Sequence, residues 1–277
     1  MKVNRTGKAH PSHKEGLKFR FAQPGGSSAP PESSSINKIS SSVDLARRKN
    51  SDLISRLQNL FVALVTDTLD DDYGGLHEKR YLMSPDIKPL LPDMRVAGVA
   101  CTFRGAASAK IGGPIPPLEE LRKATWVKGL ESIKPNDVVV YATNYCKSVG
   151  VLGELMANAF AARGGVGAIT DGYARDLNRL LWIKPSFPFF ATGSTAADSK
   201  GRFEFLDFNE PVWCGGVLVN TGDYILGDFD GVVVIPQKIA EEVITKAEAR
   251  SKSEDKVRVA FRKGEPIADV FDKYRVA

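Results

Sequence analysis

The stretch that decides the fold is Gly150–Asp176, which reads GVLGELMANAFAARGGVGAITDGYARD. Apolar residues recur at helical spacing over Leu155–Arg163, and the pair Gly164-Gly165 is a normal helix end. The next residues, Val166–Thr170, form a short apolar run of the kind found in buried strands. A helix that leads directly into a buried strand predicts an α/β unit.

The same alternation continues on both sides of this stretch. Strands are predicted at Val96–Phe103, Asp137–Tyr141, Phe187–Ala191, Val217–Val219, Tyr224–Gly227 and Gly231–Ile235. Helices are predicted around Leu53–Val65, at Leu118–Gly129 and Leu177–Trp182, and from Ile239 onward with a break near Gly264–Pro266. Strands that alternate with helices and then give way to a run of short strands predict a layered α/β sandwich with a mixed sheet.

Residues 1–42 differ in composition from the rest of the chain. They are rich in Ser, Pro, Gly and Lys, and they hold seven basic and two acidic residues, a surplus that equals the net charge of +5 of all 277 residues. Such a segment cannot bury enough apolar surface to offset its ordering entropy, so we expect a disordered basic tail followed by a single domain at 43–277. The tail predicts weak contact with polyanions rather than specific nucleic-acid recognition.

Histidine and cysteine usage narrows the chemistry. Of three histidines, only His77 lies after the tail, which disfavours a Ser-His-Asp triad or a histidine-rich zinc site. The three cysteines are widely spaced, no CxxC occurs, and no apolar run is long enough to span a bilayer. We therefore expect a cytoplasmic protein whose chemistry rests on carboxylates, arginine, lysine or a hard metal ion.

A group of residues within Gly150–Asp176 can bind an anion. Gly153 opens the helix, so the backbone N–H groups of Glu154, Leu155 and Met156 lack intrahelical acceptors and can hold a carboxylate. Arg175 and Asp176 lie just past the end of the predicted strand, where open α/β sheets commonly bind ligands.

The chemistry of these two side chains suits a 2-oxo acid. The Arg175 guanidinium fits a carboxylate or keto acid, and the Asp176 carboxylate suits Mg²⁺ or Mn²⁺. The alternative is that Arg175 pairs with a surface acid and that Glu154 is only a favourable acid at a helix start.

The spacing of these residues resembles a known family. Glu154 is followed by twenty residues and then by Arg175-Asp176. This pattern is similar to that of the RraA-like (regulator of ribonuclease activity A-like) family, which includes 4-hydroxy-4-methyl-2-oxoglutarate and 4-carboxy-4-hydroxy-2-oxoadipate aldolases. The segments Val65–Asp70, Pro89–Phe103 and Pro211–Pro236 resemble that family as well, so the likeness covers about residues 60–250.

The resemblance implies a fold of the swivelling-domain type and a role for each site residue. Arg175 would bind the 2-oxo acid end and stabilise a pyruvate enolate, and Asp176 would ligate a divalent metal, Mg²⁺ or Mn²⁺, partly through waters. The N–H groups from Gly153 to Met156 would hold the substrate carboxylate, and Glu154 would position or deprotonate a catalytic water.

The function expected from this resemblance is that of a class II, metal-dependent pyruvate aldolase or oxaloacetate decarboxylase. Two alternatives remain open: a non-catalytic regulator that binds an RNA-degrading enzyme, and a sugar-acid dehydratase or decarboxylase. A methyltransferase is disfavoured because no glycine-rich nucleotide motif is present.

Two further features bear on the substrate and on assembly. Arg179 stands where the family commonly carries an acid, which puts the aldol substrate in doubt more than the fold. The aromatic segment Phe203–Trp213 lies outside the predicted elements, and aromatic residues are enriched at subunit interfaces. We expect a homo-oligomer, a trimer or hexamer, with the alternative that these residues cover the chain's own sheet.

Overall fold

The structure, a computed structural model, describes residues 50–75, 80–109, 115–183 and 186–275. The described residues belong to one compact unit. The tail predicted at 1–42 and His77 lie outside the described residues.

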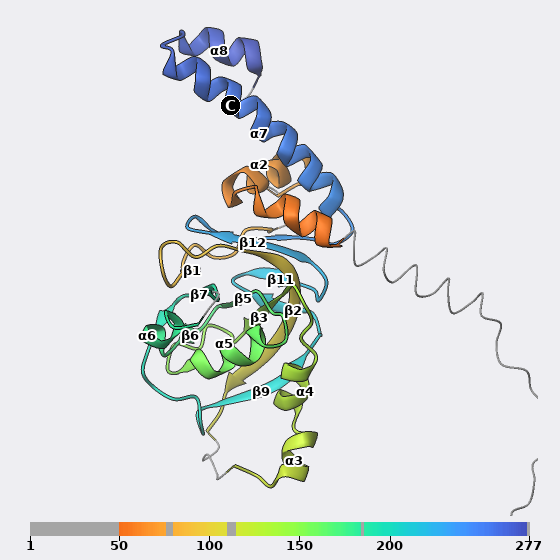
Figure 1. Ribbon diagram of the computed structural model, residues 1–277, viewed down its shortest axis with the longest axis vertical. Coiled ribbons are helices and arrows are strands. Elements are labelled where there is room, and N and C mark those ends of the chain that lie inside the picture. Colours follow the sequence, from red (N-terminus) through yellow and green to blue (C-terminus); the bar gives the residue numbers. More distant parts are fainter. Residues whose placement is uncertain (1–49, 76–79, 110–114, 184–185, 276–277) are drawn as a thin grey trace, which may run out of the picture. The chain divides into compact units, whose positions relative to one another are not determined.

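One eight-stranded mixed sheet organises the compact unit (Figure 1). Its strands are β1 (Lys88–Pro89), β2 (Val96–Ala107), β3 (Asp137–Ala142), β5 (Gly167–Thr170), β7 (Phe189–Ala191), β9 (Phe203–Phe208), β12 (Tyr224–Asp228) and β13 (Gly231–Ile235). Strands β2, β3, β5 and β7 are parallel neighbours, whereas β1, β9, β12 and β13 pair antiparallel with their neighbours. The predicted α/β fold with a mixed sheet is confirmed.

The sheet curves towards closure because residues just before β1 pair with β13. The Met83 N–H donates to the Val232 carbonyl at 2.9 Å, and the Val234 N–H donates to the Tyr81 carbonyl at 2.9 Å. The Lys88 ammonium donates to the Asp230 carbonyl at 2.8 Å. These bonds join the β13 side of the sheet to the β1 side, so the sheet approaches a barrel.

Alternation along the strands produces separate apolar clusters. In β3, Val138 and Val140 join the same cluster as the hairpin of β10 (Val212–Cys214) and β11 (Val217–Val219). The next residue along, Val139, joins a second cluster with Phe160 of helix α5 (Glu154–Ala161). Because successive side chains of a strand point to opposite faces, the sheet is covered on both sides.

A third apolar cluster attaches helices to β12 and β13. It includes the helical stretch 50–58, α2 (Val62–Tyr73) and the first turns of α7 (Ala240–Arg262). Helix α8 (Ile267–Tyr274) packs on the other end of α7, where Phe261 and Phe271 meet edge to face. The break between α7 and α8 lies at Gly264, which has a φ of 76°.

The cysteines and the helices can be compared with what the sequence led us to expect about disulfide bonds and membrane spans. Cys101, Cys146 and Cys214 are free and buried, and burial raises the pKa of Cys101 to about 12. None of the helices among the described residues combines the length and apolar character that crossing a membrane requires.

The predicted secondary structure was wrong in two segments. The helix expected over Leu118–Gly129 is two helices, α3 (Leu118–Lys123) and α4 (Thr125–Glu131), because Ala124 between them adopts extended backbone with a ψ of 132°. The segment Phe203–Trp213, expected to lack regular structure, contains β9 and most of β10. The pairing of β9 with β2 shifts at Arg104/Gly105. Such an irregularity breaks strict alternation and conceals a strand in the sequence.

The aromatic residues of β9 pack against their own chain. Phe205 contacts Phe103 and Tyr141, with ring centroids 5.2 and 5.8 Å apart, and Phe203 meets Tyr141 at 5.8 Å. Together with Phe208 they cover the cluster that holds α5. This packing agrees with the alternative that these rings cover the chain's own sheet, whereas Leu206 and Trp213 of the same segment are exposed.

Neighbouring residues of β9 provide a matched test of this packing. Phe205→Ala removes a half-buried ring and two aromatic contacts, so we expect the free energy of unfolding to fall by about 2–3 kcal/mol. Leu206→Ala removes a side chain that is 45% exposed and is expected to change it by less than about 0.5 kcal/mol. Urea denaturation measures both, and equal effects would contradict this account of β9.

Candidate functional site

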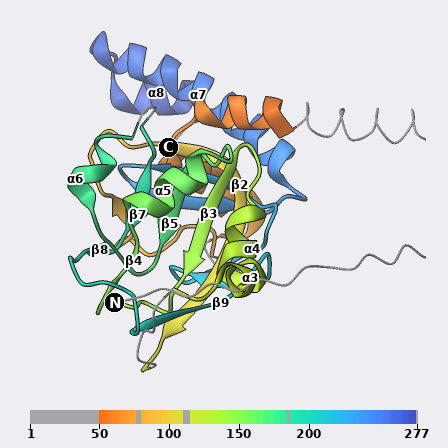
Figure 2. The ribbon, with the colours of Figure 1, turned by 60° about the horizontal axis from the view of Figure 1, so that its bottom comes forward.

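A small second sheet brings the two ends of the predicted site together. It consists of β4 (Gly150–Leu152), β6 (Tyr173–Ala174) and β8 (Gly193–Ser194), all parallel. The Arg175 N–H donates to the Leu152 carbonyl at 2.8 Å, and the Thr195 N–H donates to the Ala174 carbonyl at 2.9 Å. The residues that follow β4, β6 and β8 therefore meet at one edge (Figure 2).

Helix α5 starts at this edge. Gly153 caps it in extended conformation, and its carbonyl accepts the first helical hydrogen bond, from Ala157, at 3.1 Å. The N–H groups of Glu154, Leu155 and Met156 therefore belong to the first turn, which has no intrahelical acceptor for them. They carry the partial positive charge of the helix start, where an anion is stabilised.

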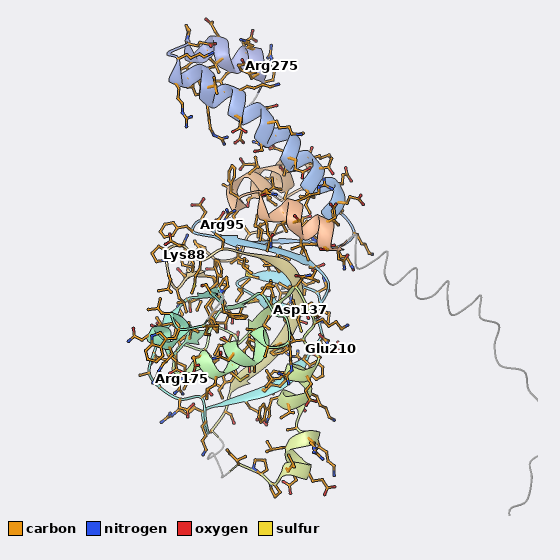
Figure 3. The ribbon with its side chains drawn as sticks, in the orientation of Figure 1. Lys88, Arg95, Asp137, Arg175, Glu210 and Arg275 are labelled. Atoms are coloured by element: carbon orange, nitrogen blue, oxygen red, sulfur yellow. The ribbon has the colours of Figure 1, made fainter. Side chains whose placement is uncertain are left out.

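Arg175 and Asp176 lie directly over this helix start. A Cβ atom placed on Gly153 would be 2.5 Å from Asp176 Oδ2 and 2.9 Å from Arg175 Cγ. A Cβ on Gly150 would be 2.7 Å from the Arg175 Cβ. Glycine at 150 and 153 thus permits the close approach of these side chains, and three predicted site residues, Gly153, Arg175 and Asp176, are neighbours. Arg175 is labelled in Figure 3.

Arg175 stands between two carboxylates. Its Nε lies 3.3 Å from the Asp176 carboxylate, and its Nη1 donates to Asp198 Oδ1 at 2.8 Å. The Arg175 side chain is 30% exposed, and those of Asp176 and Asp198 are 34% and 56% exposed. The guanidinium is held in place yet remains open to solvent, so a carboxylate ligand can compete with Asp198 for it.

Asp198 was not identified from the sequence. It follows β8, and Gly150 of β4 donates its N–H to the neighbouring Ala197 carbonyl at 2.9 Å, which places Asp198 beside Arg175. Strands of two or three residues such as β6 and β8 carry no recognisable alternation. The sequence therefore gave no signal that residues 23 positions apart would meet.

Glu154 lies at the helix start, but its side chain points along the helix. Its Oε1 accepts a hydrogen bond from the Asn158 Nδ2 at 2.5 Å. The backbone of Glu154 belongs to the anion-binding turn, whereas its carboxylate is engaged with the next turn of α5. Use of Glu154 as a base would require that this bond be exchanged.

The carboxylates present suit one kind of metal ion. Within the described ranges, no group of three or more His, Cys, Asp or Glu residues could hold a metal ion together. Mg²⁺ usually keeps several waters and binds proteins through one or two carboxylates, unlike structural zinc. Asp176, in a left-handed conformation with a φ of 61° at the start of α6 (Leu177–Leu180), fits such a hydrated ion.

Arg179, which replaces the family's usual acid, is engaged elsewhere. Its guanidinium carbon lies 4.2 Å from the centre of the Trp182 ring, a cation–π contact.

The close packing over Gly153 leads to a first test of the site. Gly153→Ala would push its methyl group against Asp176 and Arg175, and overpacking of this kind costs roughly 1–3 kcal/mol. We expect Arg175 and Asp176 to shift and catalytic efficiency to fall at least about tenfold. Steady-state kinetics of a 2-oxo acid cleavage would measure this, with melting temperature as the control for folding. Unchanged kinetics would show that the two side chains do not act from this position.

Comparison with known proteins gives the same family as the sequence resemblance. The model of the RraA-like family, described as Aldolase/RraA, matches residues 63–234. The chain is 28% identical over 207 residues to a Halalkalibacterium halodurans protein named "Putative 4-hydroxy-4-methyl-2-oxoglutarate aldolase", a match that covers 75% of this chain and 87% of that protein.

Two solved structures are similar as well. Streptomyces coelicolor RraAS2, described as an unusual member of the RNase ES inhibitor RraA protein family, is 26% identical with a TM-score of 0.61, covering 75% of this chain and 96% of that one. An uncharacterized protein from Pseudomonas syringae pv. tomato shares the fold, with a TM-score of 0.67 at 23% identity over 81% of this chain and 94% of that one. With the family model matching more than half of its residues, the chain belongs to the RraA-like family.

Proposed function

We propose that the protein is a divalent-metal-dependent lyase that cleaves the carbon–carbon bond next to a 2-oxo acid. The observation that carries the proposal is the meeting of three features at one edge: the first turn of α5, the Arg175 guanidinium and the Asp176 carboxylate. The name of the Halalkalibacterium halodurans relative supports an aldolase. Retro-aldol cleavage of a 4-hydroxy-4-methyl-2-oxoglutarate type of substrate and decarboxylation of oxaloacetate both leave a pyruvate enolate.

The residues at this edge can each perform one part of that reaction. The N–H groups of Glu154, Leu155 and Met156 would bind the substrate carboxylate, and Arg175 would bind its 2-oxo acid end and stabilise the negative charge of the enolate. Donors fixed in advance at the position where charge develops give the largest part of such catalysis. Glu154 would position or deprotonate a water after release from Asn158.

The metal site would be formed mainly by Asp176. A carboxylate held at the start of α6 and beside Arg175 fits a hydrated Mg²⁺ or Mn²⁺. When bound there, the ion would act as a Lewis acid on the 2-oxo group.

A screen of 2-oxo acids tests the proposal. The full-length protein is incubated with oxaloacetate, 4-hydroxy-4-methyl-2-oxoglutarate and 4-carboxy-4-hydroxy-2-oxoadipate in the presence of Mg²⁺ or Mn²⁺, and released pyruvate is measured. We expect pyruvate from at least one of them, at a rate well above that without protein.

The second candidate is a regulator that binds an RNA-degrading enzyme. The similarity to Streptomyces coelicolor RraAS2 favours it. Such a protein would lower the activity of an RNase E-type enzyme and release no pyruvate, and its effect would persist when Arg175 is replaced. The two assays together separate the candidates.

We also propose that the active form is a homo-oligomer, a trimer or a hexamer. Large apolar side chains lie exposed near the site: Leu155 on the first turn of α5 is 78% exposed, and Leu181 and Trp182 after α6 are 52% and 68% exposed. Exposed apolar side chains of this size mark interaction surfaces when they are contiguous. Light scattering at micromolar concentration is expected to give a multiple of three subunits, and a fully active monomer would contradict this.

A further inference from the structure

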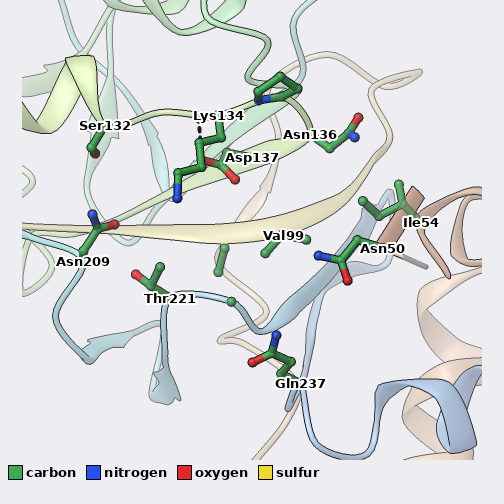
Figure 4. Close-up of a pocket in the computed structure, with 13 residues that line it drawn as sticks. Asn50, Ile54, Val99, Ser132, Lys134, Asn136, Asp137, Asn209, Thr221 and Gln237 are labelled. Carbon is green, nitrogen blue, oxygen red and sulfur yellow. Dashed lines mark hydrogen bonds between the residues drawn. The ribbon is translucent and has the colours of Figure 1, made fainter. Parts of the chain in front are cut away.

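A second cleft lies at the end of the sheet opposite to Arg175. It has a volume of about 590 Å³, within the range of small-molecule sites, and it opens beside Asp137, the first residue of β3 (Figure 4). Arg175 lies instead beyond the carboxyl end of β5, which runs parallel to β3. The cleft is therefore separate from the candidate lyase site.

Carboxamide side chains from separate segments line this cleft. Asn50 comes from the helical stretch 50–58, Asn136 from the turn before β3, Asn209 from the link between β9 and β10, and Gln237 from the residue pair after β13. Figure 4 shows all of them around one open space. A carboxamide is uncharged and both donates and accepts hydrogen bonds, so a group of them suits a neutral ligand whose own groups do the same.

The segments that carry these side chains are fixed to the sheet by backbone hydrogen bonds. The Asn209 N–H donates to the Thr102 carbonyl at 2.8 Å, and the Gly222 N–H donates to the Ala100 carbonyl at 2.9 Å. The Val99 N–H donates to the Asn136 carbonyl at 3.0 Å. The cleft is thus formed before any ligand arrives, which lowers the entropic cost of binding.

Internal contacts also orient two of the amides. The Tyr224 hydroxyl donates to Asn50 Oδ1 at 3.0 Å, and the Cys101 thiol lies 3.6 Å from Asn209 Oδ1. Because the oxygen of each amide is used inside the protein, its NH₂ group is the part presented to a ligand. Opposite them, Asp137 uses Oδ2 to accept the Lys134 N–H at 2.8 Å, which leaves Oδ1 as an acceptor.

The charges and the shape of the lining select the ligand class. Lys134 and Asp137 are the charged lining residues and they cancel, so neither a polyanion nor a cation is favoured. The lining residues that the structure describes include no aromatic ring on which a flat base could stack. A ligand hydroxyl group can accept a hydrogen bond from an amide NH₂ group and can donate one to a carboxylate. A small molecule that carries several hydroxyl groups can therefore bind the donors and the acceptors on different sides of the cleft.

We propose that this cleft is a binding site for a neutral polyhydroxylated small molecule of the monosaccharide or polyol class. Asp137 accepts hydrogen bonds from ligand hydroxyls, and Asn50 and Asn209 donate to their oxygen atoms. Thr221, whose hydroxyl lies 2.6 Å from that of Thr102, contributes a further polar contact.

Ligand-observed NMR with the full-length protein tests the site. The probes are D-glucose, D-galactose, D-mannitol and myo-inositol, with inorganic phosphate and citrate as charged comparisons. We expect saturation transfer to at least one neutral probe at millimolar concentration, none to citrate, and no loss of the neutral probe's signal when phosphate is added as a competitor. Asp137→Asn should weaken that binding roughly 10- to 100-fold, because it removes a charged acceptor. Asn209→Asp should weaken it roughly three- to tenfold while keeping the left-handed backbone at this position.

Two controls separate this site from folding and from the lyase site. Asp93→Asn alters an exposed carboxylate outside the cleft lining and should leave both the melting temperature and polyol binding unchanged. Arg175→Lys should also leave polyol binding unchanged. Absence of binding by all four neutral probes, preference for phosphate or citrate, or binding that survives both Asp137→Asn and Asn209→Asp would overturn the proposal. Because these readouts need no catalysis, failure of the lyase assay leaves them decisive.

Discussion

Replacing Arg175 with lysine is expected to lower catalytic efficiency by about 10²–10³, close to the loss seen when one preorganised oxyanion donor is removed. Lysine keeps the positive charge but lacks the planar fork that binds a carboxylate or enolate in two places. In the structure this fork spans two directions, with Nε on the Asp176 side and Nη1 on Asp198. A single ammonium cannot reproduce that arrangement.

The kinetic pattern of this variant distinguishes a catalytic from a structural role. A group that acts on the enolate should lower kcat as well as kcat/KM, since the interaction strengthens in the transition state. Arg163→Lys, on an exposed arginine at the end of α5, provides the matched control and should leave both values unchanged. Near-normal kcat/KM in Arg175→Lys would mean that Arg175 only organises the loop after β6.

Removing divalent metal is expected to abolish turnover. Among the described residues no group of three or more His, Cys, Asp or Glu side chains offers another metal site, so we expect the ion to bind through Asp176 at the start of α6. Excess EDTA should reduce pyruvate release to the rate without protein, and Mg²⁺ or Mn²⁺ should restore it. Asp176→Asn should require far higher metal concentrations for the same rate, whereas Asp207→Asn, a half-buried β9 carboxylate that pairs with Arg104, should not. Full activity in excess chelator would rule out the metal-dependent mechanism.

Much of the fold could be predicted because its main strands are continuous apolar runs. Strands β3 and β13 each contain three consecutive valines, and both strands are buried throughout or nearly so, which makes their type clear without knowledge of their partners. Helix α5 was recognised from the residues at its ends, since Gly153 precedes it and Gly164 follows it. These signals are local.

The parts that could not be predicted depend on contacts between distant segments. Strands β4, β6 and β8 are two or three residues long, and their pairing alone brings Asp198 to Arg175. The irregular pairing of β9 concealed a strand whose aromatic residues belong to the chain's own core. The polyol cleft combines single polar residues from segments that share no motif.

For the site residues, the sequence predicted which of them lie close together, but their roles were predicted only from the family resemblance. The spacing of Glu154 and Arg175-Asp176 indicated that this segment acts together, and the structure places Gly153, next to Glu154, close to Arg175 and Asp176. Their role in catalysis rests on the family resemblance and stays a prediction. The Glu154 side chain, engaged with Asn158, is the predicted catalytic residue whose placement fits least well with direct action on a substrate.

Pyruvate release from 4-hydroxy-4-methyl-2-oxoglutarate tests the central claim most directly. The purified full-length protein is assayed with Mg²⁺ by coupling pyruvate to NADH oxidation through lactate dehydrogenase, with oxaloacetate as a second substrate and Arg175→Lys beside the wild type. We expect Mg²⁺-dependent pyruvate formation by the wild-type protein and a loss of about 10²–10³ in the variant. Absence of protein-dependent pyruvate from either substrate, or equal rates in the two proteins, would contradict a lyase built on Arg175 and Asp176.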